Sequence, residues 1–313
     1  MFSCLQMKKY AILIEVRNGG FPMIKCIVCD LDGTLMKPDD SIEESAYQLL
    51  RQCMDQGIEF VIATGRDINM VIDFMAKYNF DCDLILNNGA QYRNLSGSFN
   101  DIYPMDDKAF IDIANILHGY GYLLAIHTNQ GKYSLHDTED FWEYHMELLT
   151  KNLPEGMELP KKTFTTREGY LRDFKYKATP EQIIADGAKV LKIDARHKDV
   201  YSIEGVRSQL NIEGLEYSSS YADNIEITSS VSNKGILLRK VVEDKGYAMD
   251  EVATFGDGVN DCAMLEGFKY SFAPANACDK AKQIATYTLQ KTNIEGAVGE
   301  GILLLKDMKL INM

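Results

Sequence analysis

A short apolar segment that ends in two carboxylates constrains the fold more than any other feature of the chain. Residues 24–29 read Ile-Lys-Cys-Ile-Val-Cys, and Asp30-Leu31-Asp32-Gly33-Thr34 follows at once. Such a run predicts a buried strand of a parallel sheet, and open α/β sheets place their ligands at the carboxyl ends of these strands. Asp30 and Asp32 are two residues apart, so an extended backbone would turn both toward one site. Close carboxylates repel each other, and the segment therefore predicts a metal site, an acid–base site, or both.

Short apolar runs alternate with amphipathic helical stretches, a pattern that predicts an α/β fold. The first helix is expected to be N-capped by Ser41, with Glu44 at capping-box spacing. A second helix is expected to follow Thr64-Gly65-Arg66-Asp67 and to end at Tyr78. Further buried strands are expected at 58–63 and 84–86 and, after Thr228, at 252–255, 270–272 and 287–289.

The middle of the chain departs from this parallel pattern. A hairpin is expected from 91–93 and 99–103, followed by strands at 122–127, 132–135, 190–194, 215–219 and 224–228 and helices at 107–117, 138–149, from 180 and at 200–210. Antiparallel pairs inside a parallel pattern indicate a separate layer. We therefore expect a Rossmann-like parallel-sheet core from residues 23–88 and 223–313, with a smaller α+β cap domain, residues 89–222, inserted into it.

Residues 1–22 are predicted to be an N-terminal appendage, because Met23 directly precedes the first strand. An extra edge strand is the alternative for this segment. Its apolar run, residues 10–14, is short for a signal sequence and is followed closely by Glu15 and Arg17.

Charge and cysteine content limit the partners and the compartment. The chain has 33 basic and 46 acidic residues, a net charge of −13, which argues against a nucleic-acid groove. Seven scattered cysteines suit a reducing compartment. No apolar run approaches the roughly 20 residues of a membrane span. We therefore expect a cytoplasmic protein without nucleic-acid or membrane partners, and we interpret Cys26 and Cys29 as small core residues on opposite faces of a strand.

A second acidic turn is expected to complete the site at Asp30. Asp257 and Asp261 follow the predicted strand 252–255, beside Asn260 and two glycines. Two acidic turns on strands of one parallel sheet should lie side by side, and together they would form an oxygen-rich site suited to Mg²⁺. A glycine-rich surface turn is the alternative interpretation.

Two further positions suit an anion. Thr64 and Gly65 end a strand at a predicted helix N-terminus, where free N–H groups bind anions, although a simple helix cap would also explain them. Lys234 is expected in the first turn of a helix, where the helix dipole disfavours a cation. Its side chain is therefore either solvated or engaged with an anion.

These segments, in this order, resemble the motifs of the haloacid dehalogenase-like (HAD) phosphohydrolases. The motifs are Asp30-Leu31-Asp32-Gly33-Thr34, Thr64 in Ala-Thr-Gly-Arg, Lys234 in Asn-Lys-Gly, and Gly256-Asp257-Gly258-Val259-Asn260-Asp261. The Ala-Thr-Gly-Arg form, Asn88-Gly89-Ala90 and an insert of more than a hundred residues are similar to the Cof-type subfamily with its class IIB cap. The resemblance covers roughly residues 23–305.

The resemblance implies a role for each motif. Asp30 would attack phosphorus and form an aspartyl phosphate, and Asp32 would be the general acid and base. Mg²⁺ would be held by the Asp30 carboxylate, the Asp32 carbonyl oxygen and the Asp257 carboxylate. Asp261 is counted with the metal residues, and Asn260 beside it would contact the phosphate. Thr64, Gly65 and Lys234 would clamp the phosphoryl oxygens. Asn88 and Gly89 would contact the substrate.

The expected activity is Mg²⁺-dependent hydrolysis of small phosphomonoesters, such as sugar phosphates or phosphorylated cofactors. The cap residues that could reach a substrate are His127, Tyr133, His136, Trp142, His145, Arg167 and Arg172. A phosphomutase is one alternative, in which Lys161, Lys162, Arg167 and Arg172 would hold a distal phosphate. A non-catalytic phosphosugar sensor is another, although a pure binder gains nothing from a nucleophile beside an anion.

Overall fold

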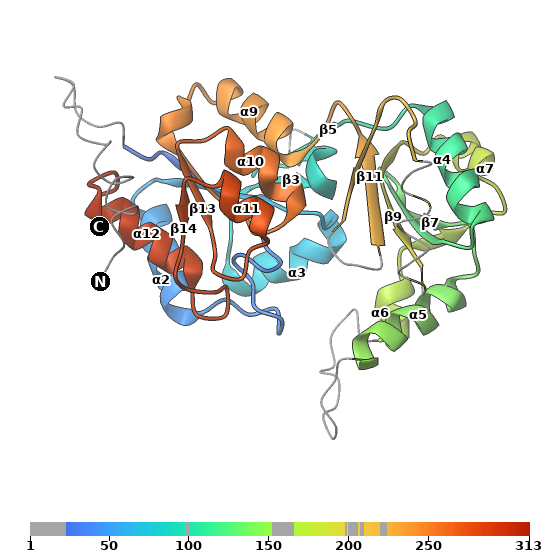
Figure 1. The fold of residues 1–313 in the computed structure, drawn as a ribbon, viewed down its shortest axis with the longest axis horizontal. Coiled ribbons are helices and arrows are strands. Elements are labelled where there is room, and N and C mark those ends of the chain that lie inside the picture. The colour runs from blue at the N-terminus through green and yellow to red at the C-terminus, as the bar shows by residue number, and fades with distance from the viewer. Residues whose placement is uncertain are drawn as a thin grey trace.

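The computed structural model describes residues 23–97, 100–151, 166–197, 199, 206, 210–219 and 224–313. They form two lobes, each built on its own sheet (Figure 1). The predicted appendage, residues 1–22, lies outside the described residues, as does the predicted helix over 200–210 except for residues 206 and 210.

The larger lobe contains an eight-stranded sheet in the order β14-β13-β12-β1-β2-β3-β4-β5. Its strands are β1 (Cys26–Cys29), β2 (Glu59–Ala63), β3 (Asp83–Leu86), β4 (Gln91–Arg93), β5 (Asn100–Ile102), β12 (Val252–Phe255), β13 (Tyr270–Ala273) and β14 (Tyr287–Thr288). The six strands from β14 to β3 pair in parallel, so the predicted parallel core is confirmed.

The hairpin β4–β5 belongs to this core sheet, although the sequence-based boundary assigned it to the cap. β4 pairs antiparallel with β3, and β5 antiparallel with β4. Only residues 87–90, which include the short helix η1 (Asn87–Gly89), separate β3 from β4. A connection this short returns the chain to an adjacent antiparallel strand and cannot cross to another layer. The other limits of the cap domain stay predictions.

Helices cover both faces of the core sheet. The helices α2 (Glu44–Asp55), α3 (Ile68–Tyr78) and α12 (Ala297–Asp307) pack on one face, and α9 (Lys234–Asp244) and α10 (Cys262–Glu266) on the other, with α11 (Asp279–Ile284) beside α10. Along β1, Cys29 packs with the first group of helices and Cys26 with the second. The prediction that these two cysteines are core residues on opposite faces is thus confirmed.

The predicted cap of the first helix is wrong, and the predicted second helix is confirmed. The N-cap of α2 is Glu43, whose carboxylate accepts a hydrogen bond from the Ala46 amide at 2.9 Å, while the Ser41 hydroxyl bonds to Asp39. The carboxylate of Glu43 lies nearer the helix than Ser41 and can reach the first free amides, which excludes the earlier cap. The helix α3 follows its N-cap Asp67 and ends at Tyr78, as the sequence predicts.

The smaller lobe is built on a six-stranded sheet in the order β10-β11-β9-β6-β7-β8. Its strands are β6 (Leu123–Thr128), β7 (Gly131–Ser134), β8 (Phe174–Tyr176), β9 (Val190–Arg196), β10 (Leu215–Ser218) and β11 (Asn224–Ser229). All neighbours pair antiparallel except β7 and β8. This mixed sheet confirms the predicted second, smaller α+β unit.

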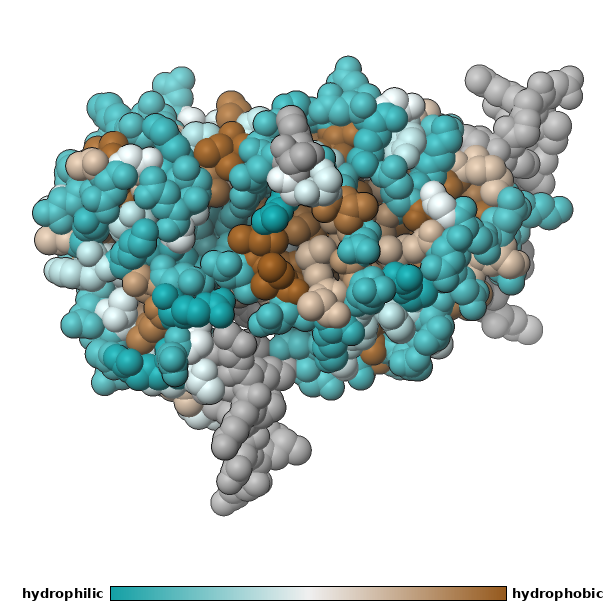
Figure 2. Space-filling view, turned by 180° about the vertical axis from the view of Figure 1, so that it is seen from behind, coloured by the Kyte–Doolittle hydropathy of each residue, from teal (hydrophilic) through white to brown (hydrophobic). Residues whose placement is uncertain are grey.

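In the described part of the smaller lobe, four helices accompany the sheet. They are α4 (Asp107–Gly119), α5 (Thr138–Lys151), α6 (Arg167–Leu171) and α7 (Pro180–Ala185). The apolar side chains of α4 pack with those of the sheet into a separate core. On the face shown in Figure 2 this lobe is mostly hydrophilic, whereas apolar residues gather on the larger lobe near the boundary. No helix in the described part of the chain has the length and apolar character that a membrane crossing requires.

Candidate active site

The predicted catalytic segments converge at the carboxyl ends of three neighbouring core strands. Asp30 directly follows β1, and β1 pairs with β12 on one side and β2 on the other. Asp257 lies just beyond the end of β12, and Thr64 directly follows β2. The two acidic turns therefore lie side by side, as the sequence predicts.

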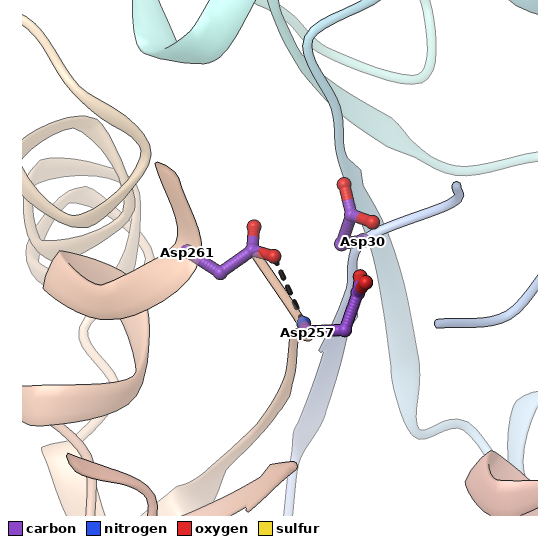
Figure 3. Close-up of side chains that lie close together, drawn as sticks. All are labelled: Asp30, Asp257 and Asp261. Atoms are coloured by element: carbon purple, nitrogen blue, oxygen red, sulfur yellow. Dashed lines mark hydrogen bonds between the residues drawn. The ribbon is translucent and has the colours of Figure 1, made fainter. Parts of the chain in front are cut away.

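Three carboxylates form the centre of this site (Figure 3). One oxygen from each of Asp30, Asp257 and Asp261 lies within 4.8 Å of the other two, a grouping that could hold a metal ion. The short helix η4 (Val259–Asp261) brings Asp261 back toward the strand end. There its Oδ2 accepts hydrogen bonds from the backbone amides of Asp257, at 3.0 Å, and Gly258, at 2.8 Å.

Lys234 is the cation of the site. Its Nζ lies 2.6 Å from Asp30 Oδ1 and 2.7 Å from Asp261 Oδ1, and its side chain is fully buried. Burial disfavours the charged ammonium, but the carboxylates of Asp261 and Asp30 outweigh it and raise the pKa of Lys234. Lys234 is therefore an ammonium ion at neutral pH, and Asp30 and Asp261, which it contacts, both belong to the acidic cluster.

One lysine does not balance three carboxylates. Burial raises the pKa of Asp30 well above its ordinary value, Lys234 opposes the rise, and Asp261 adds to it. Burial and the charge of Asp261 likewise raise the pKa of Asp257 to about 7. The positive charge of Lys234 thus does not offset burial and the neighbouring carboxylates, and a divalent cation would supply the missing charge.

The carboxylate of Asp32 is held by Arg66. It accepts two hydrogen bonds from this side chain, at 2.8 Å from Nε and 2.6 Å from the terminal nitrogen, and it is not part of the three-carboxylate group. The chain turns directly after Cys29, so the alternation of an extended strand does not continue to Asp32. The predicted role of Asp32 as general acid and base stays a prediction.

Two glycines allow the backbone to approach this close. Gly33 has φ +82°, and a Cβ there would lie 2.4 Å from Asp257 Oδ2. Gly89 has φ +98°, and a Cβ there would lie 2.2 Å from the carbonyl carbon of Asn233, directly before Lys234. Positive φ is readily adopted only by glycine, and no side chain fits either contact. Gly89 was predicted to contact substrate, but here it packs against the backbone that carries the lysine.

The remaining predicted core residues lie around this centre. Thr64 is fully buried, and its Oγ1 accepts a hydrogen bond from the Arg66 amide at 3.2 Å. A Cβ on Gly65 would lie 2.9 Å from Asn88 Oδ1, so these two loops are in contact. Asn260 Nδ2 donates to the same Asn88 oxygen at 3.1 Å, which joins the loops after β2, β3 and β12.

The predicted cap residues have varied surroundings. His127 Nδ1 lies 3.2 Å from Asp67 Oδ2 across the two lobes. The other six lie within the smaller lobe: Tyr133 bonds to Asp186, His136 packs on His118, Trp142 and His145 pack on Tyr170, Arg167 pairs with Glu139, and Arg172 with Asp173. Lys161 and Lys162 lie outside the described residues.

Sequence reasoning missed the polar residues that join the two lobes. Lys132 Nζ lies 3.0 Å from the Asp67 carboxylate, and Lys192 Nζ donates to the Gly65 carbonyl oxygen at 2.9 Å. Glu226 accepts a hydrogen bond from Asn88 at 3.0 Å. A signal was present in residues 192–196 and 225–227, where charged residues alternate with isoleucine or alanine, because such alternation predicts a strand with one polar face.

Comparison with known proteins agrees with this site. A family profile described as haloacid dehalogenase-like hydrolase matches residues 27–302. The phosphatase YwtE of Bacillus subtilis, which acts on 5-amino-6-(5-phospho-D-ribitylamino)uracil, is 26% identical over 284 residues, 88% of this chain and 96% of that protein. The pyridoxal phosphate phosphatase YbhA of Escherichia coli is 26% identical over 267 residues, 85% of this chain and 93% of that protein.

Solved structures share the whole fold. A haloacid dehalogenase-like hydrolase from B. subtilis matches with a TM-score of 0.76 at 24% identity, covering 90% of this chain and all of that one. A HAD/COF-like hydrolase from Plasmodium vivax matches with a TM-score of 0.73 at 21% identity, covering 92% and 97%. The chain belongs to the haloacid dehalogenase-like hydrolase family. Within that family it is a Cof-like phosphatase, as its motifs predict.

Proposed function

We propose that this chain is a Mg²⁺-dependent phosphomonoester hydrolase that works through an aspartyl phosphate on Asp30. The observation that carries the proposal is the cluster of Asp30, Asp257 and Asp261 within 4.8 Å around the buried Lys234. A nucleophilic carboxylate splits one difficult displacement into two easier ones. The cluster supplies that carboxylate together with groups that manage its charge.

The donor set fits magnesium. All three side chains offer hard carboxylate oxygens, and Mg²⁺ binds through a few carboxylates together with waters and phosphate oxygens. Asp30 and Asp257 are the proposed side-chain ligands, with the Asp32 carbonyl oxygen beside them. Asp261 already accepts from two amides and from Lys234, so we assign it to holding the turn and the lysine. The bound cation would neutralise charge between the nucleophile and the phosphoryl oxygens.

The proposed reaction has two displacements. An Asp30 oxygen attacks phosphorus, the bond from phosphorus to the leaving oxygen breaks, and Asp32 donates a proton to that oxygen. Asp32 then removes a proton from water, which attacks phosphorus, and the bond to Asp30 breaks to release phosphate. Proton transfer of this kind contributes about 10²- to 10⁴-fold in rate. Arg66 donates one hydrogen bond to each oxygen of the Asp32 carboxylate, which leaves a lone pair on each oxygen for the transferred proton.

Positive charge and hydrogen-bond donors manage the phosphoryl group. A carboxylate that approaches a phosphate dianion meets a repulsion of several kcal/mol at an effective dielectric of about 20. Lys234, the Thr64 hydroxyl and the Gly65 amide are the proposed donors to the phosphoryl oxygens, with Asn260 next to them. Such preorganised groups are the main source of catalysis in phosphoryl transfer.

The proposed substrates are small phosphorylated metabolites, either sugar phosphates or phosphorylated cofactors. The support comes from relatives that act on a ribityl phosphate and on pyridoxal phosphate. A phosphomutase would need free cations in the cap for a second phosphate. Arg167 and Arg172, which could serve, are paired with Glu139 and Asp173, and this favours hydrolysis.

A phosphate-release screen tests the proposal. Sugar phosphates, nucleotides, pyridoxal phosphate and p-nitrophenyl phosphate would be compared in Mg²⁺ and in EDTA. We expect release with several esters in Mg²⁺ and none in EDTA. Release that persists in EDTA would overturn the metal assignment. Activation by a sugar bisphosphate, with transfer and no free phosphate, would identify a phosphomutase.

A further inference from the structure

The sheet of the smaller lobe has one apolar face and one polar face. Ile225 and Ile227 of β11 pack into the apolar core of this lobe, as Ile193 of β9 does. Because strand residues alternate between faces, Glu226 of β11 and Lys192 of β9 point to the other side of the sheet. There they form an ion pair, with Lys192 Nζ 2.7 Å from Glu226 Oε1, and they are 4% and 5% exposed.

This ion pair contacts the catalytic loops of the larger lobe. Lys192 Nζ also donates to the Gly65 carbonyl oxygen at 2.9 Å. Glu226 Oε2 accepts from Asn88 Nδ2 at 3.0 Å, and Asn88 in turn accepts from Asn260 at 3.1 Å. The pair is therefore in contact with the loops that we propose to hold the phosphoryl group, on the side that the smaller lobe covers.

Stability alone does not explain this pair. Both side chains are almost completely removed from water, and the loss of hydration offsets the attraction between two buried charges. Burial raises the pKa of Glu226, but the charge of Lys192 and the hydrogen bonds from Lys192 and Asn88 together outweigh it and lower the pKa below its ordinary value. The carboxylate therefore remains charged at the boundary between the lobes.

We propose that the Lys192–Glu226 pair binds the leaving group of the substrate and selects leaving groups that carry hydroxyl groups and no second phosphate. An ammonium only donates hydrogen bonds and a carboxylate only accepts them. A hydroxyl does both, so neighbouring hydroxyls of a polyol can bond to both members of the pair. This inference deepens the proposed function and rests on it.

The other charges on this face support the selection against a second phosphate. Lys132 pairs with Asp67 at 3.0 Å, and Arg196 with Asp194 at 3.5 Å. Each of these cations, like Lys192, thus has a carboxylate partner. A second phosphate would bring two negative charges to a face whose cations are already paired, and specificity often depends on such a repulsive arrangement.

Two five-carbon esters test the hydroxyl preference. Ribitol 5-phosphate and pentyl phosphate have the same chain length and differ in the hydroxyl groups. A hydrogen bond to a charged group corresponds to about 10- to 100-fold in an equilibrium or rate. We therefore expect kcat/KM for ribitol 5-phosphate to exceed that for pentyl phosphate by at least about 10-fold in the unmodified chain.

Lys192→Met and Glu226→Gln are the informative variants, and exposed Lys189→Met and Glu213→Gln are the matched controls. Both informative variants should lose about 10- to 100-fold with ribitol 5-phosphate and much less with pentyl phosphate, so that the preference largely disappears. The controls should keep it. Equal losses with both esters would instead mean that the pair only positions Gly65 and Asn88, and no loss with either would also overturn the inference.

A binding measurement separates this inference from the proposed function. If the unmodified chain hydrolyses no phosphate ester in Mg²⁺, the proposed function fails. Calorimetric binding of the two esters to Asp30→Asn, with and without Lys192→Met, then decides the inference by itself. Tighter binding of ribitol 5-phosphate that Lys192→Met abolishes would support it. Equal affinity for both esters would overturn it. Thermal unfolding of every variant verifies that the fold is intact.

Discussion

Lys234 is a cation in the first turn of α9, a position that the helix dipole disfavours. The sequence left two explanations open, a solvated side chain or one that holds an anion. The structure decides for the second, because Nζ lies 2.6 Å from Asp30 and 2.7 Å from Asp261 and no part of the side chain is exposed. Such a pair of contacts compensates for the dipole and for burial together.

Replacing Asp30 tests its role as the nucleophile. Asp30→Asn keeps the shape of the side chain and an oxygen for Lys234, but an amide cannot form the acyl phosphate. We expect phosphate release to fall by at least about 10³-fold. The melting temperature should not fall, since the change removes a carboxylate whose pKa burial and Asp261 raise. Phosphate release and thermal unfolding are the measurements.

Asp244→Asn, an exposed position at the end of the same helix that carries Lys234, is the matched control for this substitution. It should leave both phosphate release and the melting temperature close to those of the unmodified chain. Undiminished turnover in Asp30→Asn would disprove the nucleophile assignment. Loss of turnover accompanied by a large drop in melting temperature would mean that Asp30 is needed for folding instead.

At the scale of elements, the contact between η1 and the start of α9 positions the lysine. A Cβ at Gly89 would lie 2.2 Å from the Asn233 carbonyl carbon and 2.7 Å from the Lys234 amide nitrogen. These are backbone atoms, so the helix start itself must move to admit a side chain. Gly89→Ala therefore alters the position of Lys234 without changing any catalytic group.

We expect Gly89→Ala to lower the free energy of unfolding by more than about 2 kcal/mol, because backbone strain adds to the clash. Phosphate release should fall as well. Gly57→Ala is the control, since Gly57 also has positive φ, +86°, but a Cβ there meets nothing within 4 Å. It should cost only about 1 kcal/mol. Urea unfolding of both variants decides the matter, and equal losses would contradict the proposed role of the contact.

The success of sequence reasoning differs between elements for a physical reason. The parallel order of β12, β1 and β2 follows from apolar runs and short connections, which are local properties. The position of Asp257 beside Asp30 follows from that order. In contrast, the hairpin β4–β5 was misassigned because its pairing with β3 depends on which sheet edge is open. The helix α12 was not predicted from the sequence.

The same distinction holds for the site. Motif residues such as Lys234 could be identified because residue type and position in an element restrict their roles. Lys192 and Glu226 could not, because their function depends on a contact between lobes that lie far apart in the chain. Strand alternation could not predict the hydrogen bond between Asp32 and Arg66, because the strand ends at Cys29, before Asp32.

At the scale of the whole molecule, the carboxylate of Asp67 is among the groups that connect the two lobes. Asp67 Oδ1 caps α3 at the Met70 amide, while Oδ2 lies 3.2 Å from His127 and 3.0 Å from Lys132 of the smaller lobe. Burial would raise the pKa of Asp67, but the hydrogen bond to His127 and the charge of Lys132 lower it strongly. The boundary thus depends on a carboxylate that stays ionised.

His127 makes this contact sensitive to pH. Burial and the charge of Lys132 lower the pKa of His127, whereas the hydrogen bond to Asp67 raises it. The net effect is a pKa below the ordinary value of 6.5. The ring is therefore neutral at pH 7 and donates to Asp67 through Nδ1. A depressed pKa contributes stability that is present above about 6.5, the value of an exposed histidine, and is lost as pH falls toward the lower value in the folded chain.

We expect the unmodified chain to lose more free energy of unfolding between pH 7 and pH 5 than His127→Asn does. Asparagine can keep a donor to Asp67 but has no proton to gain in this range. Urea unfolding at both pH values measures the difference. Parallel losses in the two proteins would show that the pH dependence comes from other groups.

Metal binding should stabilise the larger lobe as a whole, because only the folded chain brings Asp30 and Asp257 together. A ligand that binds only the folded state adds about 2.7 kcal/mol at one hundred times its dissociation constant. Without metal, the raised pKa of Asp257, about 7, means that stability is full at low pH and declines as pH rises through that value. In the unliganded chain the contribution of Asp257 to stability is therefore smallest at alkaline pH.

Asp257→Asn should reverse the effect of magnesium on stability. At pH 8 in EDTA we expect this variant to melt at the same temperature as the unmodified chain or higher, because the amide keeps an acceptor for Thr34 and carries no charge. In MgCl₂ the order should invert, since only the unmodified chain retains the ligand and gains from binding. Thermal unfolding in MgCl₂ and in NaCl of equal ionic strength separates binding from screening. A rise in melting temperature that Asp257→Asn shares fully would mean that magnesium binds elsewhere. The absence of any rise in the unmodified chain would contradict a metal held by Asp30 and Asp257.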